Sequence, residues 1–537
     1  MAGQIVGIST YLRLVGAGWR LVRADALLPR ELATDLPPGP RALAGFLRLF
    51  AGGEARRGRP GERLARVLER QGPVGIKMGQ FLSTRADIFG VQFADDLAHL
   101  KDRLPAFPIA TARETVAQAL GRPVESLYAD FEAPVAAASL AQAHPARLAD
   151  GRKVAVKVLR PGVERQVAGD IAVMALAARL AERWAPASRR LEPVAFAETV
   201  GRALELELDL RFEAAGADEL RAVLSDDGFM SAPRVVWDGV ARRVLTLEWA
   251  EGLPLSDAAA LEQTGLDRRR LAETLIRAFL AQALDHGVFH ADLHEGNLFV
   301  QAPAEIMAVD FGIVGRLGPD ERRYLAEILW GFLQRDYARV ADAHFEAGYV
   351  PGHHDRAAFA QALRAVGEPV FGRKAQDVSM GRLLAQLFEI TALFDMRLRP
   401  ELVLLQKTMV TVEGVARRID PGSNIWAAAD PVVRRWMLRE LSPANRARRL
   451  VKDARAVVGA LARAAEKEAQ TAATGSASAP ATTDVDPSPG STAAAGQAVA
   501  SSREGEVPSN IAFLLGVLTA ALFFLAAFFT VPYWLHR

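Results

Sequence analysis

The chain has 537 residues, of which 50 % are hydrophobic and 24 % charged, so it is long enough for more than one domain with a sizeable core. A formal net charge of +2 provides no basic surface of the kind that binds nucleic acid, and no nucleic acid is expected as a partner. The absence of cysteine excludes disulfides and cysteine-ligated zinc sites.

Residues 1–110 are predicted to form an N-terminal helical extension. The first 30 residues place arginines among apolar residues and lack the unbroken apolar core of a signal peptide, which favours an amphipathic helix. Such a helix either packs on its own domain or lies on a membrane surface. Apolar residues at intervals of three and four predict further helices over Pro60–Gln71 and Lys77–Ile88, and another over Ala110–Leu120.

Residues 111–252 contain short apolar runs between turn signals, which indicates a lobe of mixed strands and helices, that is, an α+β class. The turn pair Asp150-Gly151 is followed by a β-branched alternation over Lys153–Val158, which predicts a hairpin strand. Other elements expected here are two strands over Val235–Trp237 and Arg243–Trp249 and a long helical stretch over Val163–Val223.

The predicted hairpin strand ends in the sequence Val-Ala-Val-Lys, and Lys157 matches the kinase lysine that contacts the α- and β-phosphates of ATP. Such a lysine pairs with a helical glutamate, for which Glu205, Glu207 and Glu213 are the candidates. Only eight of the 65 cationic residues are lysines, so a lysine within a motif is expected to be needed for its ammonium group. The lysines within such segments are Lys77, Lys153, Lys157 and Lys407.

An alanine-rich segment stands where kinases carry a glycine-rich phosphate loop ahead of the lysine. It is predicted to form the loop over the nucleotide. Because alanine has a Cβ and glycine does not, this loop should be stiffer and lie differently over the phosphates. The ATP-binding residues predicted in it are Val135, Ala136, Ala137, Ala138, Ser139, Leu140, Ala141, Gln142 and Ala143.

Residues 253–468 are predicted to form a mostly helical lobe that carries the catalytic motifs. The segment His290–Asn297 matches the kinase catalytic loop H-R-D-L-x-x-x-N, with alanine in place of arginine. Asp292 then suits the catalytic carboxylate, and Asn297 suits a magnesium ligand. Asp310 opens an Asp-Phe-Gly motif thirteen residues after Asn297, as a second magnesium ligand. The expected cofactors are ATP and Mg²⁺.

A zinc site is the alternative interpretation of the same region. His286, His290 and His294 are four residues apart, and on a continuous helix their imidazoles would share one face. Gly287 and Gly296 interrupt the set and favour a catalytic loop over a helix.

The segment after Asp-Phe-Gly departs from conventional protein kinases. No A-P-E sequence follows, and Ile313–Pro319 are expected to run directly into a helix that begins near Asp320. The activation segment and the platform for a peptide substrate are therefore missing, which argues against a conventional protein kinase.

The C-terminal part has the composition of a tethered membrane anchor. Residues 469–508, rich in Ala, Ser, Thr, Gly and Pro, are predicted to be a flexible linker. Ile511–Val531 contains 21 residues without a charge, enough for a helix that spans the roughly 30 Å hydrocarbon core of a bilayer. A single-pass C-terminal transmembrane helix is therefore expected, with the large N-terminal part in the cytoplasm.

The alanine-rich loop, the Val-Ala-Val-Lys strand, the catalytic loop and the Asp-Phe-Gly motif together resemble the UbiB family of atypical, protein-kinase-like ATPases, which includes the mitochondrial coenzyme Q kinases. Two further family signatures are present, K-x-G-Q as Lys77–Gln80 and E-x-D as Glu207–Asp209. The similarity runs from about residue 60 to about residue 420.

The resemblance implies a protein-kinase-like bilobal fold whose N-terminal extension covers the nucleotide site. The K-x-G-Q helix, with Lys77 and Gln80, is then a regulatory cover held by Glu207 and Asp209, and Glu213 is the partner of Lys157. The implied activity is ATP binding and hydrolysis, stimulated by membrane and phenolic lipid ligands, in ubiquinone (coenzyme Q) biosynthesis at the bacterial inner membrane. The implied partners are membrane lipids, prenylated quinone precursors and other ubiquinone-biosynthesis proteins.

The chain also departs from the family pattern, and two rival functions stay open. Leu293 and Glu295 occupy positions that are often proline, and one membrane span is found where bacterial relatives commonly have two. The first rival is a nucleotide-binding scaffold without turnover, against which the intact Asp292, Asn297 and Asp310 count. The second is a conventional membrane-tethered protein kinase. The phosphoryl acceptor and the oligomeric state are not predicted.

Overall fold

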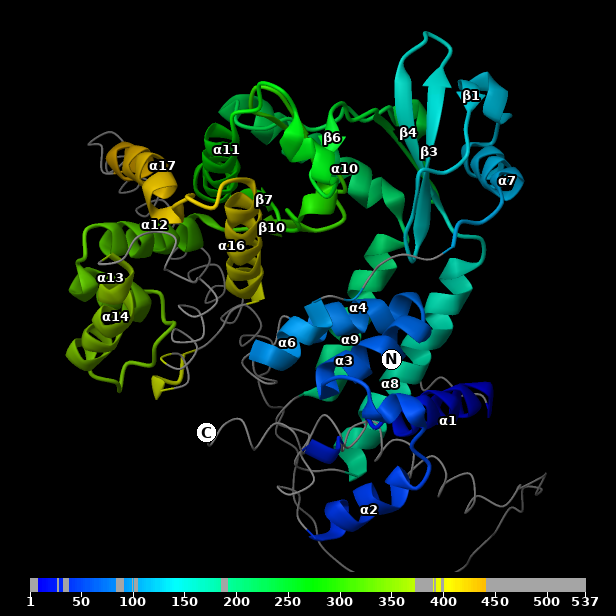
Figure 1. Ribbon diagram of the computed structural model, residues 1–537, viewed down its shortest axis with the longest axis horizontal. Coiled ribbons are helices and arrows are strands. Elements are labelled where there is room, and N and C mark those ends of the chain that lie inside the picture. Colours follow the sequence, from blue (N-terminus) through cyan, green and yellow to red (C-terminus); the bar gives the residue numbers. More distant parts are fainter. Residues whose placement is uncertain are drawn as a thin grey trace, which may run out of the picture. The chain divides into compact units, whose positions relative to one another are not determined.

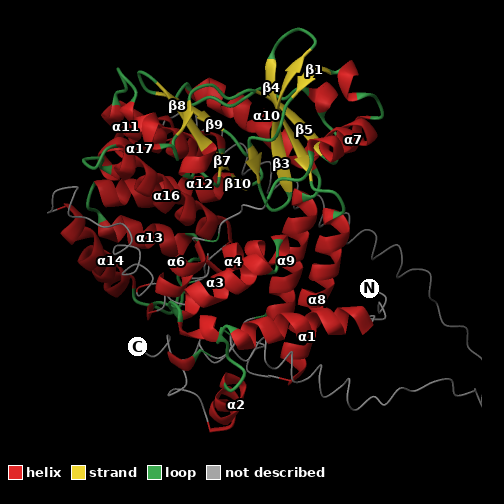
Figure 2. Ribbon diagram, turned by 45° about the vertical axis from the view of Figure 1, so that its right-hand side comes forward, coloured by secondary structure: helices red, strands yellow, loops and turns green. Residues whose placement is uncertain are grey.

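The computed structural model describes residues 8–26, 29–31, 38–83, 91–98, 100, 105–184, 192–371, 390, 393–396 and 400–440. This part of the chain mixes helices with antiparallel sheets, as predicted (Figures 1 and 2). Within it, no helix combines the length and the apolar character needed to cross a bilayer. The predicted linker, residues 469–508, and the predicted span, Ile511–Val531, lie outside the described residues.

The N-terminal part consists of helices, and three of them, α3 (Pro60–Arg70), α4 (Pro73–Ser83) and α6 (Val91–Ala98), pack against one another. Proline begins both α3 and α4, where its fixed φ suits the first helical turn. The two helices lie close enough that a Cβ on Gly75 would come within 2.2 Å of the Leu68 carbonyl oxygen, so this position requires glycine. These helices are α1 (Ile8–Arg23), α2 (Pro38–Arg48), α3 (Pro60–Arg70), α4 (Pro73–Ser83), α6 (Val91–Ala98) and α7 (Ile109–Leu120).

A five-stranded antiparallel sheet follows, in the order β1-β3-β4-β5 with β2 paired to β3. Gly151 has a φ of 86° in the turn between β3 and β4, a conformation for which glycine is suited. Helix α7 packs on one face of the sheet, where Val154, Val156 and Val158 of β4 are fully buried (Figure 1). The strands are β1 (Tyr128–Phe131), β2 (Ala136–Ala137), β3 (Ala141–Leu148), β4 (Lys153–Leu159) and β5 (Val244–Glu248).

The predicted strand at Lys153–Val158 is confirmed as β4, and the one at Arg243–Trp249 as β5. The strand predicted over Val235–Trp237 is wrong. Val235 makes a single bridge to Leu247, and a 3₁₀ turn begins at Trp237. A run of three apolar residues is too short a pattern to distinguish a strand from an isolated bridge.

The long helical stretch predicted over Val163–Val223 is divided into three helices. Pro193 occupies the first turn of α9, and the Asp209 side chain caps α10 by accepting a hydrogen bond from the Arg211 N–H. Glu207 therefore ends one helix while Glu213 lies in the first turn of the next. The three are α8 (Val163–Trp184), α9 (Pro193–Glu207) and α10 (Leu210–Asp227), and α1 and α4 pack against α8.

The remaining part carries two small sheets among helices. Strand β10 pairs with β7, so the chain forms a short strand between Asp-Phe-Gly and the next helix instead of entering that helix directly. The strands are β6 (Leu253–Pro254), β7 (Val288–His290), β8 (Leu298–Gln301), β9 (Glu305–Ala308) and β10 (Val314–Arg316). The helices are α11 (Arg268–Ala281), α12 (Pro319–Leu333), α13 (Tyr337–Glu346), α14 (Arg356–Phe371), α16 (Pro400–Ile419) and α17 (Ile425–Glu440).

Candidate active site

Lys157 joins two carboxylates that come from distant parts of the chain. Its Nζ lies 2.7 Å from Glu213 Oε1 and 2.9 Å from Glu213 Oε2, and 3.5 Å from Asp310 Oδ1. The three side chains come from β4, from α10 and from the loop after β9. Of the three glutamates that the sequence offered as partners, Glu213 is the one that contacts Lys157.

The three groups differ in their protonation because one cation faces two carboxylates, of which Glu213 is buried and Asp310 is partly exposed. The Lys157 ammonium holds the pKa of Asp310 down to about 2. Burial raises the pKa of Glu213 to about 7, although Lys157 opposes that effect. Burial would lower the pKa of Lys157, but Asp310 and Glu213 together raise it. Lys157 and Asp310 therefore both stay charged at neutral pH. A cation that binds phosphate and an anion that binds a metal ion need to be charged.

Asp310 adopts a backbone conformation that L-residues rarely occupy, with a φ of 61°. Its Oδ1 accepts a hydrogen bond from the Gly312 N–H at 3.3 Å, which helps to hold this turn. Phe311 next to it is buried, with its ring 5.4 Å from the imidazole of His290. Unusual backbone geometry of this kind persists only where the surroundings fix it, and it is concentrated at functional sites.

Asp292 and Asn297 are held against each other by the catalytic loop. The Asn297 Nδ2 donates to the Asp292 carbonyl oxygen at 3.0 Å, which directs the amide oxygen elsewhere. His290 accepts a hydrogen bond at Nδ1 from the Asp292 N–H and contacts the Val309 carbonyl oxygen through Nε2. Burial lowers the pKa of His290, so it serves as a neutral brace for the loop.

The residues present fit a magnesium ion. Asn297 offers its amide oxygen, and the Asp310 side chain keeps 49 % of its surface accessible while ionised. Carboxylate and amide oxygens, supplemented by substrate phosphates, are the ligands that Mg²⁺ takes at nucleotide sites. Asn297 and Asp310 are thus the residues that would hold the ion.

The K-x-G-Q helix reaches the same site through Lys77. Its Nζ lies 2.6 Å from Glu207 Oε1. Burial raises the pKa of Glu207 against the opposing effect of Lys77, and the nearby Lys77 also contributes to the lowered pKa of Asp310. Gln80 follows one turn later on α4, where its carbonyl accepts a hydrogen bond from the Ser83 hydroxyl.

Asp209, the second carboxylate of the E-x-D motif, has a different environment. It caps α10 and forms an ion pair with Arg211 at 2.6 Å. The hydrogen bond from Arg211 holds the pKa of Asp209 below its usual range. Asp209 therefore fixes the start of the helix that carries Glu213, while Glu207 is the residue that contacts Lys77.

The alanine-rich segment forms a tight turn between β2 and β3. Ala138 N–H donates to the Ala141 carbonyl oxygen at 2.8 Å, and Val135 N–H donates to that of Ala143 at 2.9 Å. Arg160 tightens the turn further, since its Nε donates to the Ala138 carbonyl oxygen at 2.9 Å. Ala143 lies opposite Lys157 in the pairing of β3 with β4, so the two side chains share one face of the sheet.

Gln142, predicted to bind ATP, points to the other face of the sheet. Its side chain is buried, accepts a hydrogen bond from the Phe107 N–H at 2.9 Å and donates to the Phe107 carbonyl oxygen at 3.1 Å. Its Nε2 also lies 2.8 Å from His144 Nε2. The side chain of Gln142 thus ties the segment before α7 to the sheet, on the face opposite to Lys157.

Lys407 is a site residue to which the sequence assigned no role. It lies on α16, next to Thr408, whose hydroxyl donates to the Ala291 carbonyl oxygen at 3.1 Å. Burial lowers the pKa of Lys407, while the neighbouring Asp292 opposes that effect. The rarity of lysine in the sequence is what drew attention to Lys407. Lys77, Lys157 and Lys407 all lie at this site. The fourth such lysine, Lys153, stacks on Trp249 instead, 3.9 Å from the ring centroid.

The zinc alternative requires a continuous helix, and no such helix forms. His286 ends a π-turn and contacts Asp227, His290 lies in β7, and His294 contacts the backbone N–H of Gly296. The three imidazoles therefore do not share a face.

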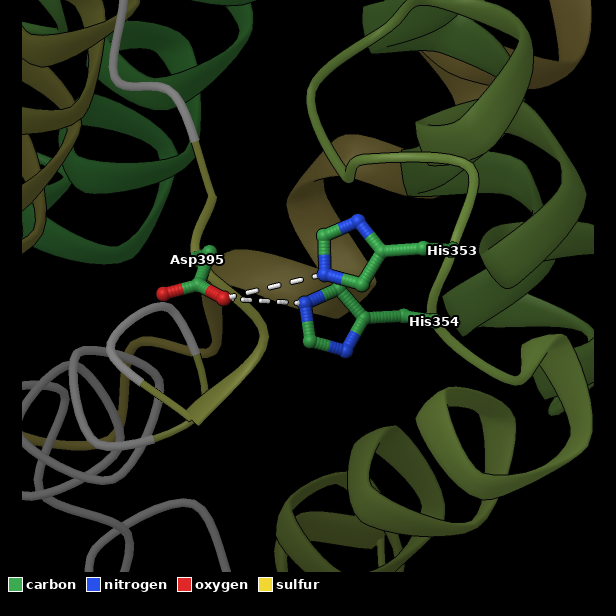
Figure 3. A group of neighbouring side chains, drawn as sticks. All are labelled: His353, His354 and Asp395. Carbon is green, nitrogen blue, oxygen red and sulfur yellow. Dashed lines mark hydrogen bonds and ion pairs between the residues drawn. The ribbon is translucent and has the colours of Figure 1, made fainter.

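Among the described residues, only one group of three brings metal-ligating side-chain atoms within 4.8 Å, and it lies elsewhere in the chain. Figure 3 shows His353 and His354 directed at the carboxylate of Asp395, with Nε2–Oδ2 distances of 4.0 and 3.1 Å. Asp395 is 69 % exposed, and the His354 ring packs against Phe394. We interpret these contacts as a tie between two surface turns.

Comparison with known proteins identifies the family of this chain. The chain matches the model of the ABC1 atypical kinase-like domain over residues 99–344 and that of the UbiB helical domain over residues 363–424. A "Probable protein kinase UbiB" from Marinobacter nauticus is 41 % identical over 390 residues, covering 72 % of this chain and 71 % of that protein. A protein of the same name from Pseudomonas paraeruginosa is 39 % identical over 437 residues, covering 79 % and 82 %. The chain belongs to the UbiB family.

Membership of the UbiB family confirms the protein-kinase-like fold with mixed helix and sheet. Among solved structures, the Rv3197–erythromycin complex from Mycobacterium tuberculosis is 20 % identical, with a TM-score of 0.47, over 68 % of this chain and 90 % of that chain. The two positions that depart from the UbiB pattern are accommodated: Leu293 is fully buried, and Glu295 forms an ion pair with Arg418 of α16.

Proposed function

We propose that this chain is a membrane-anchored ATPase or small-molecule kinase of the UbiB family that acts in ubiquinone biosynthesis. The observation that carries the proposal is the contact of Lys157 with both Glu213 and Asp310. In protein kinases, the corresponding lysine–glutamate pair and the aspartate at the metal are the parts that must be in place for phosphoryl transfer.

Nucleotide binding is assigned to Lys157 and to the alanine-rich turn. The Lys157 ammonium binds the α- and β-phosphates, and Glu213 holds that ammonium in position. The turn over Val135–Ala143 covers the phosphates through its backbone. Its hydrogen bonds between β2 and β3 support a stiff cover, in keeping with alanine in place of glycine.

Phosphoryl transfer is assigned to four residues. Asn297 and Asp310 would hold Mg²⁺, which would supply charge neutralisation for the transferred phosphate. Asp292 orients the nucleophile and accepts its proton as the oxygen attacks the γ-phosphorus and ADP leaves. Lys407 balances the charge of Asp292 before the proton arrives, a role supported by the effect of Asp292 in raising the pKa of Lys407 against burial.

Water or the hydroxyl of a lipid is the proposed nucleophile. We assign Lys77, Gln80, Glu207 and Asp209 to a regulatory cover that would exclude a peptide. The ion pair of Lys77 with Glu207 supports this assignment. Membrane lipids and prenylated quinone precursors are the proposed ligands, and other ubiquinone-biosynthesis proteins are proposed partners. Turnover of ATP would give these precursors access to the biosynthetic enzymes.

The proposed location is the bacterial inner membrane, with the kinase-like part on the cytoplasmic side. The support is the uncharged run Ile511–Val531, which is long enough to span a bilayer as a helix. Flotation of the full chain and of a chain that ends at residue 470 with phospholipid vesicles tests the anchor. The proposal expects the shorter chain to lose most of its flotation; equal flotation of both would contradict it.

The activity is tested by ATP hydrolysis of the full chain in vesicles with Mg²⁺, with and without a phenolic quinone-precursor mimic, beside Asp292→Asn. Turnover that rises with the mimic and is lost in the variant is expected. Tight ATP binding without turnover under any condition would instead favour the nucleotide-binding scaffold. Strong phosphorylation of added proteins would favour a conventional protein kinase.

A further inference from the structure

Helix α16 contacts the catalytic loop at two points. The buried hydroxyl of Thr408 donates to the Ala291 carbonyl oxygen at 3.1 Å. Ten residues further along the helix, Arg418 forms an ion pair with Glu295. Asp292 lies between these two contacts in the loop. The helix also packs against α11 and β10, so it gives the loop a fixed support.

Arg418 projects from the face of α16 that carries Lys407. The two residues are eleven positions apart, which is close to three turns of 3.6 residues, so their side chains share a face of the helix. Asp292 raises the pKa of Lys407 against the effect of burial, in keeping with a face that is directed at the catalytic loop. The ion pair with Glu295 therefore lies on the same side of α16 as the carboxylate assigned to proton transfer.

Glu295 begins the turn that carries the amide assigned to Mg²⁺. It is the first residue of a 3₁₀ turn that ends at Asn297. The Asn297 N–H closes this turn by donating to the His294 carbonyl oxygen at 2.9 Å, and the Asn297 Nδ2 donates to the Asp292 carbonyl oxygen. Gly296 has no side chain to pack, so it adds little restraint of its own. The Glu295 side chain thus ties the turn, and the two assigned groups that it connects, to α16.

The backbone at Glu295 is also suited to proline. His294 has a φ of −86° and a ψ of 164°, the extended conformation that the residue before a proline requires. The first position of a 3₁₀ turn has a φ near the roughly −65° that proline fixes. The hydrogen bond that closes the turn uses the N–H of Asn297 and not that of Glu295. Glu295→Pro should therefore stiffen the loop without any contact to Arg418.

We propose that Glu295 and Arg418 are positioning residues, which hold Asp292 and Asn297 in place by tying the catalytic loop to α16. The Glu295 and Arg418 side chains are 30 % and 42 % accessible, and ion pairs exposed to this extent contribute little to global stability. Their contribution is to the geometry of the loop, where a small misplacement of a catalytic group lowers the rate of reaction. The effect on the rate rests on the proposed function, whereas the restraint of the loop does not.

The test measures two properties of the full chain in phospholipid nanodiscs. They are steady-state ATP hydrolysis with Mg²⁺ and hydrogen exchange of the backbone amides of residues 291–297. The variants are Glu295→Ala, Arg418→Met, the double variant of these two, and Glu295→Pro. Glu368→Ala is the matched control, because Glu368 of α14 is 35 % accessible and forms an ion pair with Arg335 in the turn between α12 and α13.

Glu295→Ala and Arg418→Met should each lower kcat at least about threefold while the KM for ATP changes by less than about twofold. The double variant should lose no more than the larger single loss, because either substitution alone already breaks the ion pair. Hydrogen exchange of the loop should be faster in all three. Glu295→Pro should recover at least about half of the rate that Glu295→Ala loses, and Glu368→Ala should change neither property.

Losses of kcat no larger than that of the control, additive losses in the double variant, or a loss confined to KM would overturn the proposal. Hydrolysis by Glu295→Pro as slow as that by Glu295→Ala would also overturn it. A native chain that never hydrolyses ATP would count against the proposed function. The exchange measurement would then decide the restraint of the loop: faster exchange in Glu295→Ala and Arg418→Met would support it, and unchanged exchange would contradict it.

Discussion

The Lys77 ammonium lies 2.6 Å from a carboxylate oxygen of Glu207, and both side chains are largely buried, with 15 % and 19 % of their surfaces accessible. The pair joins α4 to the last residue of α9, a separation of more than a hundred residues along the chain. Removing either charge leaves the other without compensation in a poorly hydrated place.

Lys77→Met should lower the free energy of unfolding by about 1–3 kcal/mol, because it leaves the Glu207 carboxylate buried and unpaired. Adding Glu207→Gln should recover part of the loss, since an amide costs less to bury than a carboxylate. Urea denaturation of the native chain, of Lys77→Met and Glu207→Gln singly and of the double variant provides a double-mutant cycle. Additive losses would show that the two side chains do not interact.

Lys157→Met should weaken ATP binding by at least about tenfold, because the phosphates lose a charged donor and Glu213 and Asp310 lose their shared cation. Lys153→Met is the matched control on the same strand, since Lys153 stacks on Trp249 instead. Nucleotide titration should show little change for the control. Equal weakening in both variants would indicate a general effect on β4.

The candidate site residues could be predicted from sequence because each lies in a short motif with fixed spacing. Lys157, Asp292, Asn297 and Asp310 were identified in this way, and the fold brings Lys157 and Asp310 together. The boundaries within Val163–Val223 were missed although Pro193 and Asp209 signalled them, a proline suited to a first turn and an aspartate suited to a cap.

Gln142 shows that motif spacing does not predict to which face of a sheet a side chain points. Whether its side chain shares a face with Lys157 depends on the register of β3 against β4, and neighbouring residues of a strand point to opposite faces. Lys407 illustrates the same limit over a longer range. Its approach to Asp292 depends on the packing of α16 through Thr408, which no local pattern encodes.

Glu213 should make the folded chain less stable as the pH rises, the opposite of what most carboxylates do. Burial raises the pKa of Glu213 to about 7 from its ordinary value of 4.5, so between these pH values the folded chain holds a proton that the unfolded chain releases. The contribution of Glu213 to stability therefore falls as the pH rises from about 4.5 to about 7, and is constant above that.

Glu213→Gln removes this titration. The free energy of unfolding of the variant, relative to that of the native chain, should rise by on the order of 2 kcal/mol between pH 5 and pH 7.5. Urea denaturation at the two pH values measures the difference. Parallel behaviour of the two chains would mean that Glu213 titrates as it does in the unfolded state.

Lys407→Met should lower the rate of ATP turnover by about tenfold or more while ATP affinity changes by less than about threefold, because the Lys407 charge acts on Asp292, to which we assign the proton transfer. Lys407→Arg, which keeps the charge, should restore part of the rate. Steady-state kinetics separate kcat from KM. A loss confined to KM, or no rescue by arginine, would exclude the proposed role.

The most direct test of the account is single-turnover hydrolysis of ATP by the full chain with Mg²⁺, beside Asp310→Asn. Asp342→Asn is the matched control, an aspartate on α13 that is 43 % accessible and paired with Arg356. If Asp310 holds the metal at the phosphates, its variant should lose at least about a hundredfold in rate while the control stays within about twofold. Hydrolysis by Asp310→Asn at the native rate would contradict the assignment of this site.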